Sequence, residues 1–340
     1  TGELLWTASN TGADLNIPTM TNSIPASLSV IDITGDGLID YLFAADTGGR
    51  VFRIDINPST SSASDFATGG EIASLAGSDE ANNRRFYNKP NVALVKDKEY
   101  GDYLTIAIGS GYRAHPIQTT AVENRFYMIK DFNPYSTPSS YSSVSEASST
   151  KTTLSEGESA DSTKLYNATS LMNEGEDALT SDMQVLLTNG GGWYVTFDTT
   201  GEKVLAESTT FSSAIIFTTF SPSGSTVSTC GADTGQSRIY ALSQKWAMAA
   251  IDLNGDGETD ENDSFVELAH SGIAPRPVII YQPDGGKTIA IGTETIEDDR
   301  FEQDASSEDC EAAGTCEGEV SKCELSNCNV TPVYWRQNDD

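Results

Sequence analysis

Residues 30–57 read V-I-D-I-T-G-D-G-L-I-D-Y-L-F-A-A-D-T-G-G-R-V-F-R-I-D-I-N, an oxygen-rich loop followed directly by two short apolar strands. The segments 41–45 and 51–56 are rich in β-branched and aromatic residues, and the second alternates apolar with polar positions. The turn D-T-G-G at 46–49 separates them, which indicates a β-hairpin. The stretch therefore predicts an acidic loop at the entry of a hairpin.

The loop before this hairpin has the spacing of a calcium-binding loop. Alternate residues of a tight loop can turn their oxygens toward one centre, and Ca²⁺ takes six to eight oxygens at about 2.3–2.6 Å. Gly37 stands at position 6, where a sharp turn needs a positive φ. The predicted ligands, at positions 1, 3, 5, 7 and 9, are Asp32, Thr34, Asp36, the carbonyl of Leu38, and Asp40.

A second loop, D-L-N-G-D-G-E-T-D-E-N-D at 252–263, repeats the device and matches the D-x-[DN]-x-[DN]-G pattern more closely. Its predicted ligands, at positions 1, 3, 5, 7, 9 and 12, are Asp252, Asn254, Asp256, the carbonyl of Glu258, Asp260 and Asp263. The first loop is the weaker match, because position 12 is Phe43 and position 3 is a neutral threonine. Ordinary turns rich in Asp and Gly are the alternative interpretation. We expect two Ca²⁺ ions rather than Mg²⁺, because the loops supply many carboxylates and little rigid octahedral geometry.

The overall charge limits the partners. The chain has 340 residues, with 20 Lys and Arg against 50 Asp and Glu, a formal charge of −30. Nucleic acids and anionic membranes attract the opposite sign, so neither is expected as a partner. No apolar run approaches the ~18 residues of a membrane span, so no membrane insertion is expected. The opening T-G-E-L-L-W reads as the middle of a folded domain, which suggests a mature or trimmed product.

The cysteines indicate an oxidising compartment. Four lie in the acidic tail, at Cys310, Cys316, Cys323 and Cys328, without a C-x-x-C pair or a nearby histidine. Disulfides are therefore expected rather than zinc, with three pairings open. Cys230 is either free or paired with one tail cysteine.

The fold class follows from many short strands with almost no helical periodicity. The predicted strands are 27–32, 41–45, 51–56, 92–95, 103–109, 125–130, 183–188, 193–197, 203–206, 213–220, 237–242, 265–269, 277–281, 288–292 and 331–335. Such a pattern fits a sandwich, a barrel or a propeller. A strand–turn–strand phrase that recurs at 41–56, 103–131 and 213–243 favours an all-β, partial or complete β-propeller.

The whole chain, 1–340, is expected to form one propeller domain with two long insertions. Residues 136–164 are rich in Ser and Thr, and residues 294–328 are acidic and rich in cysteine. Both are expected to be surface excursions, because their composition buries little apolar area. The N-terminal residues are either an outer blade strand whose inner strands precede residue 1, or a flexible terminus.

Few residues in the sequence could form a known type of catalytic site. Histidine occurs only at His115 and His270, and no Walker loop, G-x-S-x-G elbow or H-E-x-x-H motif is present. His115, in a loop after a strand, is a candidate ligand-contact residue, and a merely solvent-exposed loop histidine is the alternative interpretation. The sequence therefore gives no support to an enzymatic function.

Several phrases together resemble one family, the PilC/PilY proteins, which are tip-associated adhesins of type IV pili. The phrase at 31–55 resembles the family's calcium-loop blade, and I-A-I-G-S-G-Y-R at 106–113 with R-F-Y-M-I-K-D at 125–131 resembles its next blade. The phrases G-G-W-Y-V-T-F at 191–197, T-G-E-K-V at 200–204, I-F-T-T-F-S-P at 216–222, S-R-I-Y-A-L at 237–242 and V-Y-W-R at 333–336 follow in the family's order. The resemblance thus covers most of the chain.

The resemblance implies the C-terminal β-propeller of such a protein, whose calcium loop regulates pilus extension, retraction and twitching motility. It carries the family site onto Asp32, Thr34, Asp36, Leu38 and Asp40, with Thr34 departing from the usual Asp or Asn. The implied location is extracellular, at the pilus tip and associated with the bacterial outer membrane. The implied partners are minor pilins of the tip complex, a host or surface receptor, and the N-terminal part of the same precursor. A quinone-dependent propeller dehydrogenase and a calcium-dependent glycan-binding or integrin-like module are the alternatives.

Overall fold

The described strands form four β-sheets and one small two-stranded pair. The computed structural model describes residues 2–60, 62–98, 100–118, 122–222, 235–281, 287–297 and 330–332. The first sheet contains β3 (Ser29–Ile31), β4 (Tyr41–Ala45), β5 (Arg50–Ile56) and β6 (Ala67–Ser74) in that order. The second sheet has the order β10 (Ser145–Glu146), β11 (Lys164–Asn167), β12 (Gly192–Thr196), β9 (Arg125–Asp131), β8 (Tyr103–Gly109), β7 (Asn91–Val95), β21 (Val330–Pro332).

The remaining strands form two further sheets and a small pair. The third sheet has the order β13 (Lys203–Val204), β15 (Ala214–Ser221), β16 (Gln236–Ser243), β17 (Phe265–Glu267), and β14 (Thr209–Phe211) also pairs with β15. The fourth sheet is β18 (Val278–Tyr281), β19 (Lys287–Ile291) and β20 (Glu294–Glu297). Near the N-terminus, β1 (Ala8–Ser9) pairs with β2 (Leu15–Asn16).

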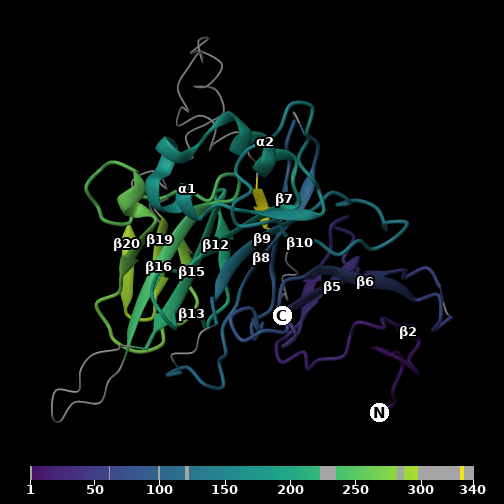
Figure 1. Ribbon diagram of the computed structural model, residues 1–340. Coiled ribbons are helices and arrows are strands. Elements are labelled where there is room, and N and C mark those ends of the chain that lie inside the picture. The colour runs from purple at the N-terminus through teal and green to yellow at the C-terminus, as the bar shows by residue number, and fades with distance from the viewer. Residues whose placement is uncertain are drawn as a thin grey trace.

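The sheets follow one another across the molecule (Figure 1). Apolar side chains form a core between each pair of neighbouring sheets. Phe43 and Val51 of the first sheet share a core with Leu104 and Tyr127 of the second. Between the second and third sheets, Phe126 stacks on Phe217 with the ring centroids 3.8 Å apart. The opposite face of β15 and β16 packs against β19 of the fourth sheet. Each sheet therefore contacts its neighbours through its faces, as propeller blades do.

The expected fold class is confirmed. The molecule is nearly all β, and within the described residues the sheets do not close into a ring, which makes it a partial propeller. Every predicted strand except 183–188 overlaps an observed strand, and the recurring phrases are the antiparallel pairs β4–β5, β8–β9 and β15–β16. The sequence prediction missed the strands β1, β2, β6, β10, β11, β14 and β20.

The predicted strand 183–188 is wrong, because this segment is a helix. The helices α1 (Thr169–Glu174) and α2 (Ser181–Asn189), joined by the 3₁₀ turn η1 (Gly175–Ala178), lie together at one end of the sheets (Figure 1). They connect β11 to β12, which run parallel, and a parallel pair needs a long crossover that is usually helical. Within the described residues no helix is long and apolar enough to span a bilayer.

The insertion 136–164 packs on the sheets more than its composition predicts. Tyr141 packs against the core between the first and second sheets, and its hydroxyl donates to Asp55 at 2.7 Å. Val144 is buried in the same core, and its backbone N–H donates to Ile72. A few apolar side chains thus anchor a segment that is polar on average. All five cysteines, residues 298–328 of the acidic insertion, and the V-Y-W-R phrase lie outside the described residues.

Candidate metal centre

The second acidic loop lies between β16 and β17 and is folded around its own carboxylates. Asp252 accepts hydrogen bonds from the backbone N–H of Gly255 at 2.7 Å and of Gly257 at 2.8 Å. Gly255 and Gly257 have φ angles of 76° and 91°, a region that glycine enters without strain. The two glycines therefore let the loop curl back over the first aspartate.

The last residue of this loop closes it. Asp263 ends the 3₁₀ turn η2 (Glu261–Asp263) and is fully buried. Its Oδ1 accepts from the N–H of Leu253 at 2.9 Å and of Asn254 at 3.0 Å, and its Oδ2 accepts from Asp260 at 3.1 Å. One carboxylate thus ties the end of the loop to its beginning.

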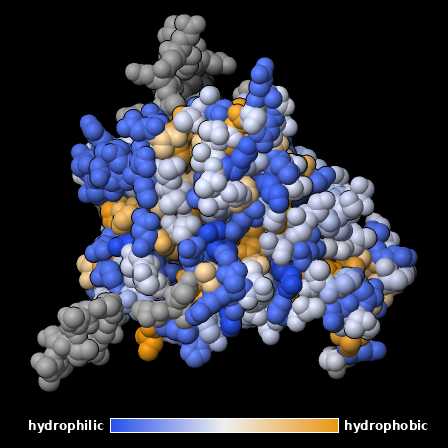
Figure 2. Space-filling model, in the orientation of Figure 1, coloured by the Kyte–Doolittle hydropathy of each residue, from blue (hydrophilic) through white to orange (hydrophobic). Residues whose placement is uncertain are grey.

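Three carboxylates of this loop converge on one point. One oxygen each from Asp252, Asp256 and Asp263 lies within 4.8 Å of the others. Oxygens bound to one Ca²⁺ at about 2.4 Å cannot be more than about 4.8 Å apart, so the observed spacing fits a shared calcium ion. The loop lies in a strongly hydrophilic corner of the surface, at the left edge of Figure 2. The donor set is hard and anionic, as calcium requires.

The first acidic loop, between β3 and β4, has the same local fold. Asp32 accepts from the N–H of Gly35 at 2.7 Å and of Gly37 at 2.8 Å, as Asp252 does from its own two glycines. The Asp32 side chain is slightly desolvated, but the N–H donors of Gly37, Gly35 and Asp36 outweigh this effect and hold its pKa below the ordinary value. The position-1 aspartate is therefore stabilised in the ionised form that a cation needs.

The two loops differ in the residue that closes them. In the first loop, Oδ2 of Asp40 accepts from the N–H of Ile33 at 2.8 Å and of Thr34 at 3.0 Å. Asp263, not Asp260, makes the equivalent bonds in the second loop. Asp40 at position 9 thus takes the role of position 12, and Phe43 at position 12 is a buried core residue of β4. The first loop is a shorter, nine-residue version of the second.

The two loops differ in how closely their predicted ligands lie to one another. Within the described residues, the carboxylates of Asp32, Asp36 and Asp40 do not form a group as close as that in the second loop. Thr34 Oγ1 donates to Asp32 at 3.3 Å. Asp260 caps η2 by accepting from Asn262 at 2.8 Å. Asn254 accepts from Asp256 at 2.8 Å and thus faces the loop backbone. The carbonyls of Leu38 and Glu258 remain predicted ligands.

A buried ionic network beneath the first loop was not predicted. Arg53 of β5 is fully buried and donates to Asp55 at 2.6 Å and to Asp131 of β9 at 2.6 Å. Its guanidinium lies 4.1 Å from the centroid of the Tyr41 ring, at the strand that follows the loop. Burial acts against the charge on Arg53, but Asp131 and Asp55 raise its pKa above the ordinary value. The only sequence signal was R-I-D at 53–55, which places both charges on one face of a strand.

Comparison with solved structures gives an independent view of the fold. The structure is similar to the crystal structure of the Pseudomonas aeruginosa PilY1 C-terminal domain, with a TM-score of 0.51 and 16% sequence identity. The chain has the fold of that domain. The similarity covers 80% of this chain and 60% of the PilY1 chain, so part of the PilY1 chain has no counterpart in the match. No family model and no curated protein matches the sequence.

Proposed function

We propose that this chain is a calcium-binding module of a type IV pilus-associated protein. Two observations support the proposal: the fold is that of the PilY1 C-terminal domain, and Asp252, Asp256 and Asp263 converge at calcium spacing. In this proposal Ca²⁺ binds the loops at 32–40 and 252–263 and pre-orders the entries of β4 and β17. The module acts through protein contacts rather than catalysis.

The proposed partners are those of a pilus tip. They are minor pilins of the tip complex, a host or surface receptor, and the N-terminal part of the same precursor, with the protein located outside the cell at the outer surface. Calcium occupancy would change how firmly the loop ends of the sheets are held, and so alter pilus extension, retraction and twitching. The formal charge of −30 favours cation binding at such a surface.

The cellular test replaces the chromosomal copy of the gene with Asp36→Ala, Asp256→Ala or the double variant in the bacterium that carries it. We expect smaller twitching zones, with the variant protein present at wild-type abundance. Glu261→Gln is the matched control, because Glu261 lies in the same loop but outside the converging group. Normal twitching and surface pili in the double variant would reject the calcium-dependent role.

The purified protein supplies the second test. We expect Ca²⁺ to raise the melting temperature of the wild type, since a ligand at about one hundred times its Kd stabilises by about 2.7 kcal/mol. Asp36→Ala and Asp256→Ala should lower the melting temperature only when Ca²⁺ is present. Identical melting of wild type and variants in Ca²⁺ would contradict a bound ion.

A further inference from the structure

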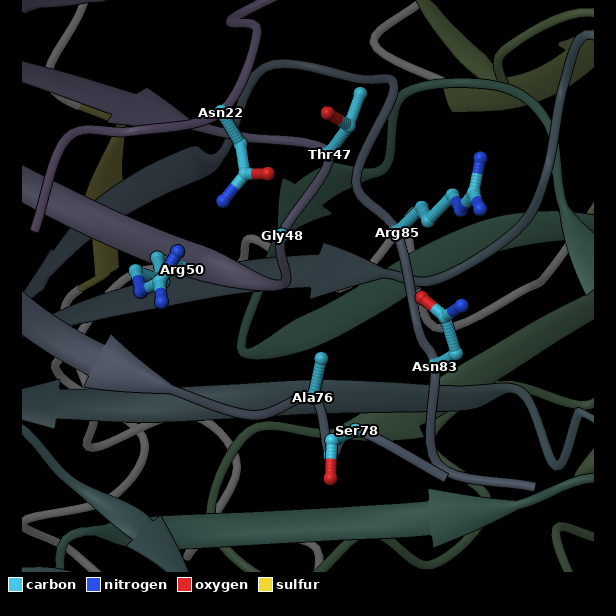
Figure 3. A pocket seen from close by; sticks show the side chains of 9 residues that line it. Asn22, Thr47, Gly48, Arg50, Ala76, Ser78, Asn83 and Arg85 are labelled. Carbon is cyan, nitrogen blue, oxygen red and sulfur yellow. The ribbon is translucent and has the colours of Figure 1, made fainter. Parts of the chain in front are cut away.

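A polar pocket lies at the turn between β4 and β5, away from both acidic loops. Its volume is about 510 Å³, within the ~300–1,000 Å³ of small-molecule sites. Three segments build it: the N-terminal loop, the β4–β5 turn, and the connection from β6 to β7 (Figure 3). It is lined by Asn22, Thr47, Gly48, Arg50, Ala76, Gly77, Ser78, Asn83 and Arg85. In a chain of charge −30, this lining contains two arginines and no acid.

Backbone hydrogen bonds hold the walls of the pocket together. Asp46 Oδ1 accepts from the N–H of Gly48 at 2.8 Å and of Arg50 at 2.9 Å, which fixes the turn. The connection from β6 is tied to that turn by Leu75 N–H to the Gly49 carbonyl at 2.9 Å. Phe86 N–H donates to the Asp46 carbonyl at 3.2 Å and ties the far wall to the same turn. The pocket is therefore pre-formed rather than a gap between independent loops.

Gly48 lines the pocket next to the ends of two side chains. A Cβ added at Gly48 would lie 2.2 Å from Nδ2 of Asn22 and 2.9 Å from Nη1 of Arg50. The absence of a side chain there lets an amide and a guanidinium approach the same spot. The Asn22 amide, which hydrogen-bonds to the Asp46 carboxylate, and the Arg50 guanidinium therefore lie together at this wall of the pocket.

The two arginines differ in how their charge is balanced. Arg50 Nε lies 3.2 Å from Glu71, and its Nη1 lies 3.7 Å from the buried Asp46, so its charge is compensated. Its Nη1 is nevertheless buried without a hydrogen-bond partner among the described residues. The part of Arg50 that a ligand can reach is therefore the accessible remainder of its side chain, which is 27% exposed, and not Nη1.

Arg85 carries the uncompensated charge. Within the described part of the chain it makes no ion pair, and its guanidinium lies 4.2 Å from the centroid of the Tyr112 ring. Stacking on an aromatic face orients a guanidinium while leaving its edge N–H groups available. Figure 3 places Arg85 and Arg50 on opposite sides of the hollow with Gly48 between them. The end of the pocket at Arg85 thus carries an unbalanced positive charge. At the opposite end, Asp46 and Glu71 balance the charge of Arg50.

We propose that this pocket binds the carboxylate of an acidic sugar, such as a uronic acid residue of a polysaccharide. Arg85 would pair with the carboxylate, and the exposed part of Arg50, Asn22 and Asn83 would hydrogen-bond to ring hydroxyls. Carboxamides and the hydroxyls of Thr47 and Ser78 both donate and accept, as a hydroxylated ligand demands. The assignment uses neither acidic loop and stands independently of the proposed calcium-dependent function.

The test compares methyl β-glucuronide with methyl β-glucoside, which differ only at the oxidised carbon, by saturation-transfer NMR and titration calorimetry on the whole chain. We expect the glucuronide to bind at least about tenfold more tightly than the glucoside, because a charge-assisted hydrogen bond contributes about 1.5–3 kcal/mol. Arg85→Gln should remove this preference, and Ser78→Trp, at an exposed position, should block both sugars. Arg276→Gln, at an exposed arginine elsewhere on the surface, should bind as the wild type does.

Three outcomes would overturn the proposal. Equal binding of the two sugars would remove the role of the carboxylate. Unchanged glucuronide binding by folded Arg85→Gln and Ser78→Trp would place any site elsewhere. Acetate or N-acetylaspartate binding as tightly as the glucuronide would indicate a general carboxylate site, including acidic peptides. EDTA should leave glucuronide binding unchanged, which separates this result from any failure of the calcium proposal.

Discussion

Single carboxylates in the second loop have separable structural and ligand roles. Asp263 is buried and accepts three backbone N–H groups, whereas Asp256 is exposed and accepts one, from Glu258 at 2.9 Å. Removing an acceptor costs most where the donors it leaves are buried. The loop therefore has one residue that holds its fold and another that is free to contribute mainly to a cation.

Asp263→Ala should destabilise the protein even in EDTA, by about 2–4 kcal/mol, because it leaves one buried and two partly buried N–H groups without their acceptor. Asp256→Ala should cost less than about 0.5 kcal/mol in EDTA, as exposed substitutions usually do. Urea unfolding of both variants in EDTA measures the difference. Equal losses for the two would show that Asp263 does not hold the loop together.

The buried lysine of β9 predicts a pH dependence. Lys130 donates to the carbonyls of Leu187 and Thr188 in the last turn of α2, at 2.7 and 2.9 Å. Burial lowers its pKa to about 8, nearby Lys245 adds to the shift, and Asp97 opposes it. Between about pH 8 and the ordinary value of 10.5, the unfolded chain holds a proton that the folded chain has released. The free energy of unfolding therefore rises with pH in this window.

Lys130→Met should abolish that contribution. The stability of the wild type relative to this variant should increase by about 1–2 kcal/mol between pH 7.5 and 9.5, since one pKa unit corresponds to about 1.36 kcal/mol. Urea unfolding of both proteins at the two pH values gives the comparison. Lys203, whose pKa is also lowered to about 8 by burial, is present in both and cancels. A difference that stays constant with pH would contradict the lowered pKa of Lys130.

At the scale of elements, α2 depends on the residue that precedes it. The Thr180 hydroxyl accepts from the N–H of Met183 at 3.2 Å and caps the helix. Thr180→Ala should cost about 1 kcal/mol, the usual effect of removing an N-cap. The exposed Ser181→Ala, one residue later, is the matched control and should be nearly neutral. Thermal unfolding of the two variants tests this, and equal melting temperatures would show that the cap contributes nothing.

The same helix shows where sequence reasoning failed. The residues M-Q-V-L-L-T at 183–188 have strand-forming composition, but Met183, Leu186 and Leu187 are buried at helical spacing and face β12 and its core. Thr180 before the run and Gly190 after it were helix signals. The deciding fact was tertiary: β11 and β12 are parallel, and no local pattern states the direction of a neighbouring strand.

The sequence predicted the two acidic loops, but it did not predict which carboxylate ties the end of the first loop to its beginning. Alternating oxygens and glycines specify the local turn, so the folds around Asp32 and Asp252 follow from spacing alone. The pattern also made the first loop seem incomplete because it lacks an acid at position 12. Asp40 closes it three residues early because β4 begins directly after it. The polar pocket escaped prediction altogether, since its lining comes from three separate segments.

At the scale of the whole molecule, neighbouring sheets are held together by aromatic contacts. Phe217 of β15 stacks on Phe126 of the second sheet and lies 4.9 Å from Tyr240, centroid to centroid, in its own sheet. Offset or stacked aromatic pairs add to the free energy of apolar burial. Because each core is shared by two sheets, a loop that orders one strand is coupled through packing to the next sheet.

Because the net charge is −30, any added cation can stabilise the protein by screening its self-repulsion. Stabilisation by specific Ca²⁺ binding must therefore be separated from this general effect. Added NaCl should raise the melting temperature in EDTA, because the Debye length falls from about 30 Å at 0.01 M to about 8 Å at 0.15 M and screens self-repulsion. MgCl₂ at equal ionic strength supplies a divalent reference, and Ca²⁺ should raise the melting temperature further, because the loops suit its flexible coordination better. The Asp36→Ala, Asp256→Ala double variant should keep the salt effect and lose the difference between Ca²⁺ and Mg²⁺. If the wild type melts equally in both cations, screening alone explains the stabilisation and the two loops are not calcium-selective sites.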